Sequence, residues 1–404
     1  MSIPRLSPDE AAHRVYTTLR RDPGTEQIPT AEGCQRTLAQ ALHAPVSLPP
    51  FDASAMDGYA YRAETLPADL CLPRVGSALA GHPFTDTVPP GHCVRITTGA
   101  ALPAGTDTVV IQENVDAREG DIVIHTRPEA GANVRQAGHD IQAGALMHNP
   151  GQRLTAFHCA ALAASGIAEV TVAQRPRVAV FSTGDELVSP GAVLGPGQIY
   201  DSNRLLVRSA LDSNGVHWID GGLLPDDRAA LREALGAVDA DLIVTSGGVS
   251  VGDADFLTEL LQTEGELDFW RLNLKPGKPL AFGRYGNTPF LGLPGNPVST
   301  AITALLFVRP AIAALSGGTE PDLTCWPATL GSAIRRRGGR EEFQRGIAMP
   351  TQGQLIVTSS GDQSSNRLQS FSEANCLIRL QSDQTDLQPG AGVEIIPLFG
   401  LVPA

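Results

Sequence analysis

The strongest alternation of apolar and polar positions lies between residues 177 and 262, where short apolar runs are separated by amphipathic stretches. Apolar runs of this length predict buried strands, and the amphipathic stretches between them predict helices. In order, the predicted elements are a strand at 178–182, a helix at 202–215, a strand at 217–224, a helix at 226–238 and a strand at 241–246. Because strands alternate with helices, the pattern predicts a parallel sheet with helices on both faces.

The third of these strands is followed by a glycine turn. Ser246, Gly247 and Gly248 end the strand, and the segment 254–262 then has a helical pattern. A strand that stops in a glycine turn before a helix presents free backbone N–H groups to an anion. The turn is not a nucleotide-binding P-loop, since Asp253 stands where that motif requires lysine.

Two stiff loops follow the glycine turn. The segment KPGKP places Lys275 and Lys278 beside prolines, and in GLPGNPVST (292–300) Asn296 is a natural helix N-cap before Pro297. Glycine and proline fix the backbone of these loops, while the lysines supply positive charge. The three loops together predict a site for a phosphorylated ligand.

Polar loops also follow the other predicted strands, at 182–186 and at 225–227. The carboxyl ends of parallel strands meet at one edge of a sheet, and open α/β sheets bind ligands at that edge. We therefore expect the loops after all three strands to converge on one site.

The remaining sequence predicts three further regions. Residues 1–45 are expected to be helical, with a second helical piece at 30–41, and to join 144–176 as one discontinuous, elongated domain. Between them, 46–143 contains short β-type runs separated by proline and glycine turns, which predicts an inserted β domain.

The boundaries of the last two domains are predicted where these patterns end. The α/β domain is predicted to span 177–325, and the alternating runs of 326–404 predict a small C-terminal β-barrel. Within the barrel, the charged segment 335–346 is predicted to be a solvated hairpin.

Charge and composition narrow the function. With 30 Lys and Arg against 43 Asp and Glu, the formal charge is −13, which argues against a nucleic-acid binder or an acidic-membrane binder. The six cysteines are scattered without metal-ligand spacing, and no signal-peptide core or membrane-length apolar run is present. We expect a cytoplasmic protein whose anionic ligand is held by local lysines, backbone amides or a metal ion.

Carboxylates at the predicted ligand edge indicate a metal site. Glu186 and Asp255 each follow a glycine loop, and Mg²⁺ is satisfied by one or two carboxylates together with phosphate oxygens. Asp226 and Asp227 precede a helix, so one of the two is expected to cap it. The nine histidines show no zinc-binding pair, and no serine, cysteine or lysine nucleophile has a recognisable signature.

Eight segments together resemble one family, molybdopterin molybdenumtransferase, which includes bacterial MoeA and the E domain of gephyrin. The resemblance covers essentially the whole chain in the family's order. The segments are SAMDGYA (54–60), RITTGA (95–100), GHDIQAG (138–144), STGDEL (182–187), YDSN (200–203), TSGGVSVGDADF (245–256), KPGKP (275–279) and GLPGNPVS (292–299).

The resemblance implies an enzyme of molybdenum cofactor biosynthesis. Such an enzyme inserts molybdate into adenylylated molybdopterin and releases AMP in a Mg²⁺-dependent step. It also implies an elongated homodimer, in which residues of the inserted β domain act across the interface. Further implied partners are the molybdopterin adenylyltransferase and acceptor molybdoenzymes. Two alternatives are a molybdopterin adenylyltransferase, which shares the α/β domain, and a non-enzymatic scaffold with the same fold.

The expected site residues combine the pattern with the resemblance. Arg271 stands where some relatives carry lysine, and Ser370 matches a position in the last domain. The expected catalytic residues are Asp57, Thr98, Asp140, Glu186, Asp226 (or its neighbour Asp227), Asp255, Lys275 and Lys278, with Glu186 and Asp255 as metal ligands. The expected substrate-binding residues are Ser182, Thr183, Gly184, Ser246, Gly247, Gly248, Ser250, Arg271, Pro294, Gly295, Asn296 and Ser370.

Overall fold

The apolar runs identified in the sequence form the centre of a six-stranded sheet in the computed structural model, which describes residues 6–211, 215–249, 256–270, 272–321 and 323–398. Its strand order is β16-β13-β17-β21-β20-β18. The strands are β13 (Arg177–Thr183), β16 (His217–Leu224), β17 (Leu242–Ser246), β18 (Gly265–Trp270), β20 (Ala281–Tyr285) and β21 (Thr288–Leu293). The first four in spatial order are parallel, as predicted, whereas β20 and β18 are antiparallel to their neighbours.

Helices cover both faces of this sheet, which confirms the predicted α/β class. Apolar side chains of α4 (Arg228–Ala237) and α5 (Phe256–Glu264) pack on one face. The other face carries α3 (Asn203–Ala210), together with the successive segments α6 (Pro297–Thr303), η4 (Ala304–Val308) and α7 (Arg309–Leu315). Contrary to the expectation from the sequence, one helical run, Pro297–Leu315, is long and apolar enough to cross a membrane. Its apolar window is 83% buried, as in the core helix of a folded domain.

The N-terminal helix packs on the same face as α7. Helix α1 (Pro8–Leu19) begins with a capping box, in which Ser7 and Glu10 each accept the other's backbone N–H. Its buried residues, including Val15 and Leu19, join the core of the α/β domain. The structure therefore separates α1 from the elongated region in which the sequence pattern had placed it.

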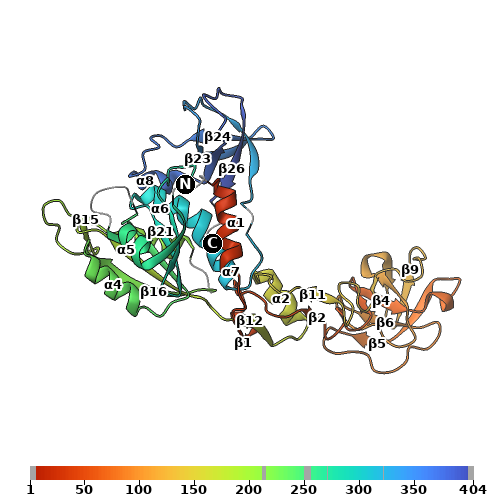
Figure 1. Cartoon of the computed structure of the whole chain (residues 1–404). Helices are drawn as coiled ribbons and strands as arrows, with labels where there is room; N and C mark the ends of the chain where they lie inside the picture. Colours follow the sequence, from red (N-terminus) through yellow and green to blue (C-terminus); the bar gives the residue numbers. More distant parts are fainter. Residues whose placement is uncertain (1–5, 212–214, 250–255, 271, 322, 399–404) are drawn as a thin grey trace.

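Two antiparallel passages of chain lead away from the α/β domain (Figure 1). We call residues 25–48 and 141–173 the connecting region. Its elements are β1 (Thr25–Pro29) paired with β12 (Glu169–Ala173), β2 (Leu42–His43) paired with β11 (Leu146–His148), the 3₁₀ turn η1 (Thr30–Glu32) and α2 (Ala156–Ala164). The prediction of a helix at 30–41 was wrong: only η1 forms. Apolar residues such as Leu38 and Ile28 are instead buried against strand β12 and its surroundings.

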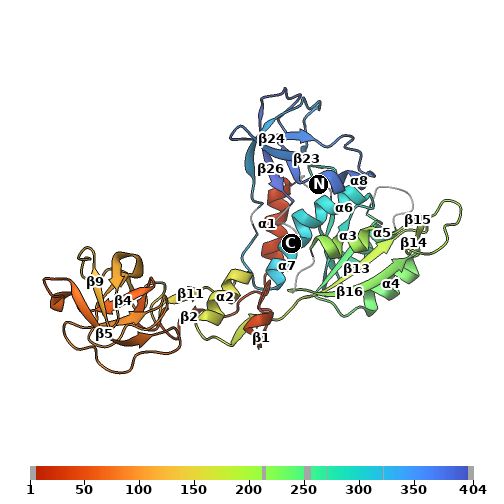
Figure 2. The ribbon, with the colours of Figure 1, turned by 180° about the vertical axis from the view of Figure 1, so that it is seen from behind.

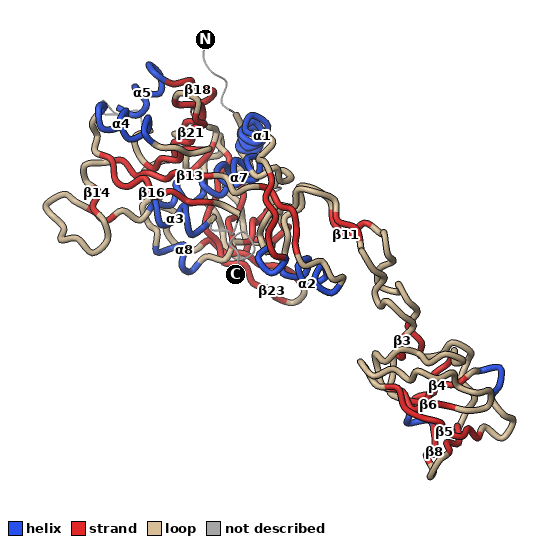
Figure 3. Tube along the Cα trace, turned by 90° about the horizontal axis from the view of Figure 1, so that it is seen from below, coloured by secondary structure: helices blue, strands red, loops and turns tan. Residues whose placement is uncertain are grey.

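The inserted β domain lies at the far end of the connecting region (Figures 2 and 3). Its sheet has the order β7-β4-β6-β5-β9-β8. The strands are β4 (Gly58–Tyr61), β5 (Cys71–Ala78), β6 (Cys93–Ile96), β7 (Thr108–Ile111), β8 (Val115–Ala117) and β9 (Asp121–Ile124). Strands β3 (Ala53–Ser54) and β10 (Val134–Arg135) pair where the chain enters and leaves the domain. The predicted short β runs are confirmed.

The C-terminal region is a closed five-stranded barrel, as predicted. Its strands are β22 (Trp326–Leu330), β23 (Glu341–Thr351), β24 (Gln354–Ser359), β25 (Cys376–Leu380) and β26 (Gly392–Pro397). Strand β23 closes the barrel because its second half pairs with β24 and its first half with β25. A short strand of the α/β domain, β19 (Leu274–Lys275), adds to the barrel in parallel with β23.

The charged segment 335–346 is not a solvated hairpin. Arg336, Glu341, Glu342, Gln344 and Arg345 are all buried. The second half of the segment belongs to β23, and the buried charged side chains find partners inside the barrel wall. Arg336, for example, donates to the backbone carbonyls of residues 340 and 381. The many charges of this segment predicted exposure to solvent, but charged side chains that find partners can be buried.

Candidate functional site

A cavity of about 710 Å³ opens at the carboxyl ends of β13, β17 and β21, where the sequence pattern predicted a site. The C-terminal barrel contributes Asn366 and Leu368 to its wall. Ten of the expected site residues line it: Thr183, Gly184, Glu186, Asp226, Ser246, Gly247, Gly248, Pro294, Gly295 and Asn296. The loops after the three predicted strands therefore do converge on one site.

The turn after β17 requires glycine, both because of its backbone conformation and because neighbouring atoms leave little room for a side chain. Gly247 and Gly248 have φ angles of +95° and +67°, in the left-handed region that favours glycine. A Cβ on Gly247 would lie 2.6 Å from the carbonyl oxygen of Thr183. The turn is held in place by a hydrogen bond of 3.1 Å from the Gly247 N–H to the Leu293 carbonyl. The two central loops of the cavity are thus tied together.

Two residues that sequence reasoning left out of the site organise it. Asp201 and Asn203 are buried and line the cavity. The Asp201 carboxylate accepts from Ser182 Oγ at 2.9 Å, so the predicted binding residue Ser182 supports the wall rather than facing the cavity. The Asn203 amide donates to Ser246 Oγ at 2.8 Å and to the Gly295 carbonyl at 2.7 Å. The segment YDSN was the signal for this pair.

Two buried polar atoms of lining residues lack a partner. Among the residues that the structure describes, Thr183 Oγ1 and Asn203 Oδ1 are buried and form no hydrogen bond. A buried polar atom without a partner is destabilising, and a bound ligand would relieve that cost. These atoms are therefore the first candidates for hydrogen bonds to a substrate.

Carboxylates converge at one side of the cavity. The Asp226 N–H donates to Asp185 Oδ1 at 3.1 Å, and Glu186 lines the same wall. Burial raises the pKa of Asp226, and the neighbouring charges of Asp185 and Glu186 raise it further. Asp227 faces away and caps α4, its Oδ1 accepting from the Ala230 N–H at 2.9 Å. Of the two adjacent acids, Asp226 is the one at the site.

This wall fits a hard divalent cation in its chemistry. Its donors are carboxylate oxygens, which Mg²⁺ prefers. Burial is the main cause of the raised pKa of Asp226, and a cation would neutralise the charges of Asp185 and Glu186 that add to it. The described residues contain no group of three or more histidine, cysteine, aspartate or glutamate side chains arranged around one point. Mg²⁺ would therefore take only one or two ligands from these residues, and oxygens of a phosphorylated substrate would supply others.

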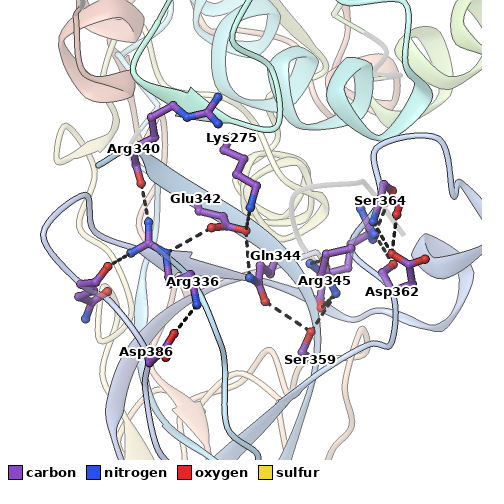
Figure 4. A network of polar contacts seen from close by, with 12 residues as sticks. Lys275, Arg336, Arg340, Glu342, Gln344, Arg345, Ser359, Asp362, Ser364 and Asp386 are labelled. Atoms are coloured by element: carbon purple, nitrogen blue, oxygen red, sulfur yellow. Dashed lines mark hydrogen bonds and ion pairs between the residues drawn. The ribbon is translucent and has the colours of Figure 1, made fainter. Parts of the chain in front are cut away.

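The expected lysines lie outside the cavity lining, to which their loop contributes Pro279. Lys275 belongs to β19 at the edge of the barrel, and its Nζ lies 2.9 Å from Glu342 Oε1 (Figure 4). Glu342 is buried and also accepts from Gln344 at 3.0 Å and from Arg336 at 3.2 Å. Lys278 is exposed. Lys275 is thus held at the joint between the α/β domain and the barrel.

Ser370 lies in the short helix α8 (Gln369–Glu373) and is half-buried, with its Oγ donating to the Arg367 carbonyl at 2.5 Å. It does not line the cavity, unlike its neighbours Asn366 and Leu368. The loop that precedes α8 is anchored to the α/β domain, because the Val298 N–H in α6 donates to the Ser365 carbonyl at 3.1 Å. The barrel therefore closes one side of the cavity through this loop.

The three expected residues of the β domain form a separate group. Asp57 Oδ1 accepts from both the backbone N–H and the hydroxyl of Thr98, at 2.7 and 2.9 Å. These bonds lower the pKa of Asp57. Asp140 lines a second cavity, of about 580 Å³, at the base of the β domain. Within one chain the connecting region holds this group away from the first cavity (Figure 1).

Ser250, Asp255 and Arg271 lie outside the described residues, so their expected roles stay predictions.

Comparison with protein families gives matches to three consecutive parts of the chain. Residues 6–166 match the MoeA N-terminal region (domain I and II). Residues 179–314 match a probable molybdopterin binding domain, and residues 327–398 match the MoeA C-terminal region (domain IV). The matched parts together carry every element of the cavity wall and of the β domain.

Individual relatives match along nearly the full length. A molybdopterin molybdenumtransferase of Haemophilus influenzae is 41% identical over 404 residues, covering 98% of this chain and 100% of the relative. Molybdopterin molybdenumtransferase 2 of Mycobacterium tuberculosis is 33% identical, covering 95% and 97%. The crystal structure of the molybdopterin biosynthesis moeA protein from Pyrococcus horikoshii OT3 superimposes with a TM-score of 0.82 at 26% identity, covering 97% and 99%.

Proposed function

The chain belongs to the molybdopterin molybdenumtransferase family and acts in molybdenum cofactor biosynthesis by inserting molybdenum, and we propose that its substrates are adenylylated molybdopterin and molybdate, with AMP as the leaving group. The observation that carries this proposal is the cavity at the carboxyl ends of β13, β17 and β21. It combines glycine loops, unpaired buried polar atoms and a carboxylate wall.

Each part of this cavity suits a phosphorylated ligand. The fixed turn at Gly247 and Gly248 allows close approach of backbone, while Thr183 Oγ1 and Asn203 Oδ1 offer hydrogen-bonding positions. Asn203 also connects Ser246 to Gly295, so it fixes the spacing of the two loops between which the ligand would lie. The barrel loop adds Asn366 and Leu368 to the cavity wall and would limit access of water from that side.

The resident cofactor that we propose is Mg²⁺. Glu186 and Asp226 would hold it, with Asp255 from outside the described residues as a further expected ligand. When bound, Mg²⁺ would neutralise phosphate charge next to these carboxylates. The chain's own residues bind and orient the substrate, and Lys275, held by Glu342, supplies positive charge at the edge of the site.

We further propose that the working form is a homodimer with shared sites. The support is the separation within one chain of Asp57, Thr98 and Asp140 from the main cavity (Figures 1 and 3). In a two-fold dimer, the β domain of one subunit can reach the cavity of the other, and symmetry makes two equivalent sites. The cytoplasm is the proposed compartment, where the molybdopterin adenylyltransferase and acceptor molybdoenzymes would be the neighbouring partners.

The test is release of AMP. The purified protein is incubated with adenylylated molybdopterin, molybdate and Mg²⁺, and AMP is followed over time. AMP that appears only when molybdate is present supports the proposal. If the protein instead consumes ATP in the presence of molybdopterin, it is an adenylyltransferase. If neither reaction occurs with a folded protein, the fold serves as a scaffold.

Two threonines provide a matched pair of variants for this assay. Thr183 and Thr245 both have a buried hydroxyl without a partner among the described residues, but only Thr183 lines the cavity. Replacing either by valine removes that hydroxyl, so neither variant should lose stability. Thr183→Val should weaken substrate binding by roughly tenfold, the effect of one lost hydrogen bond, while Thr245→Val should bind normally. Equal behaviour of the two variants would place the substrate elsewhere.

A further inference from the structure

A third cavity, which is lined by positive side chains, lies away from the proposed active site, where the connecting region meets the α/β domain. Its volume is about 250 Å³. The connecting region contributes Gln35, Thr37 and Arg153, and the α/β domain contributes Arg309, Ser316 and Thr319. Figures 1 and 2 both show α7, which begins at Arg309, running down to the connecting region beside α2. The cavity is therefore walled by two parts of the fold.

The two arginines bring like charges together in this cavity. Among the residues that the structure describes, no carboxylate lines the cavity, and the causes of the pKa shifts of the two arginines include no acidic side chain of Asp or Glu. Arg153 donates one hydrogen bond, to Gln35 Oε1 at 3.2 Å. Arg153 is exposed and Arg309 is half-buried. Desolvation lowers the pKa of both arginines, and the charge of Arg153 lowers that of Arg309 further. Each guanidinium still has N–H donors available.

This arrangement is unusual for a protein with so many acidic side chains. The chain has 43 Asp and Glu against 30 Lys and Arg, so carboxylate partners are abundant. Two cations held close together repel each other, and an anion between them would relieve that repulsion. Planar guanidinium groups bind tetrahedral oxyanions through paired N–H donors. The cavity is also smaller than pockets for drug-sized ligands, which measure roughly 300–1,000 Å³.

We propose that this cavity binds one tetrahedral dianion, of the phosphate, sulfate or molybdate type, between Arg153 and Arg309. The ion ties the connecting region to the α/β domain. The two parts already touch at this point, since the Thr319 N–H donates to the Gly151 carbonyl at 3.3 Å. A dianion between the arginines strengthens that joint, and the joint sets where the distant β domain lies. The site is independent of the proposed catalytic reaction.

Binding is tested on the full-length protein after dialysis into a chloride buffer without dianions. Sulfate, phosphate and molybdate are titrated separately by calorimetry at constant ionic strength. Wild-type protein is compared with Arg153→Gln, Arg309→Gln and the control Arg118→Gln, which removes an exposed arginine in the β domain. Each cavity variant should bind the dianion roughly 10- to 100-fold more weakly, the loss expected for a charge-assisted contact, and the control should bind normally.

Thermal unfolding gives a second readout that separates the ligand site from a structural role. Without dianions, Arg309→Gln should unfold at the same temperature as the wild type or higher, because it relieves repulsion between like charges. Sulfate should raise the unfolding temperature of the wild type and of Arg118→Gln but not of Arg309→Gln. A response to molybdate alone would make the ion a second copy of the metal substrate, whereas a response to all three would make it a general structural anion.

Two results would overturn the proposal. One is equal binding of every dianion by the wild type and both cavity variants. The other is a shift of the monomer–dimer equilibrium in the arginine variants without any change in anion binding, which would mean that a carboxylate of a second subunit fills the cavity.

Discussion

Lys275 Nζ lies 2.9 Å from Glu342 Oε1, and this contact crosses from the α/β domain to the C-terminal barrel (Figure 4). Burial tends to raise the pKa of Glu342, but the bonds from Lys275 and Gln344 outweigh it and leave that pKa below its ordinary value. Glu342 therefore remains charged and holds a flexible lysine in one place. An exposed lysine without such a partner would sample many rotamers.

The first prediction is that Glu342→Gln lowers activity by misplacing Lys275. The neighbouring residue Glu341 offers the control, because it is also buried and paired, but with Arg379 at 2.6 Å. Both variants should lose about 1–3 kcal/mol of unfolding free energy through a weakened buried contact. Only Glu342→Gln should also lower the rate of AMP release, measured under conditions where both variants are folded. Equal activity of the two variants, measured where both are folded, would mean that Lys275 needs no positioning.

The second prediction concerns two glycines that line the same cavity but differ in their surroundings. A Cβ on Gly295 would be 3.5 Å from Gly247 Cα, an ordinary contact, whereas a Cβ on Gly247 would be 2.6 Å from the Thr183 carbonyl oxygen. Gly247→Ala should therefore destabilise the protein, by roughly 1–3 kcal/mol for backbone strain. Gly295→Ala should leave stability within about 0.5 kcal/mol and weaken substrate binding by filling ligand space.

Calorimetry of substrate binding and denaturant unfolding distinguish the two effects. Normal binding by a stable Gly295→Ala variant would show that the ligand does not approach this loop. Gly247→Ala is a less direct test of ligand binding than Gly295→Ala. The close contact with Thr183 shows that the loop itself would have to shift.

Some features of the fold could be predicted from the sequence, and others could not. The position of the cavity was predictable because it depends on the order of strands and helices, and 178–182, 217–224 and 241–246 have clear apolar patterns. The segment 30–41 was predicted wrongly because a helical pattern is a local signal. The pairing of Leu38 with the other passage of chain, which buries it, is a long-range contact.

Contacts between residues that are far apart along the chain could also not be predicted from the sequence. The burial of Arg336 depends on carbonyl groups and on Glu342, which meet it only after the barrel closes. Asp201 directly precedes the helix predicted at 202–215 and Asn203 lies in its first turn, so the pattern indicated only a helix start. Only the fold shows that Asn203 spans the loops at Ser246 and Gly295.

The third prediction concerns the charge of Asp226 and the binding of Mg²⁺. Its raised pKa means that the folded protein binds its proton more tightly than the unfolded chain does. The stability of the metal-free protein should therefore increase as pH falls from the raised pKa toward the ordinary value of 3.8. Asp226→Asn removes the repulsion, so at neutral pH the metal-free variant should be at least as stable as the wild type.

In the presence of Mg²⁺, the wild type should be more stable than Asp226→Asn. Mg²⁺ should raise the unfolding temperature of the wild type through binding to the folded state and have a smaller effect on Asp226→Asn. Asp227→Asn is the matched control, because it removes an adjacent charge while asparagine still caps α4. If Mg²⁺ stabilises Asp226→Asn as much as Asp227→Asn, the carboxylate wall does not hold the metal.

The last prediction is that each active site is shared between two subunits. Asp57 lies in the β domain, where it is bonded to Thr98, while Lys275 lies at the joint with the barrel. Variants Asp57→Ala and Lys275→Ala should each be inactive alone. After subunit exchange in an equal mixture, about half of the dimers are mixed, and each mixed dimer has one intact site and one doubly damaged site. Activity should then recover to roughly a quarter of the wild-type value.

A second mixture serves as the control for this complementation. Asp57→Ala and Asp140→Ala both change the β domain, so in a mixed dimer each site receives one damaged β domain and no activity should return. Subunit exchange is verified in both mixtures with differently tagged chains. If the exchanged mixture of Asp57→Ala and Lys275→Ala stays inactive, both residues serve the same site from one chain. The connecting region would then have to bend for them to meet, because in this conformation it holds the β domain away from the rest of the chain (Figure 3).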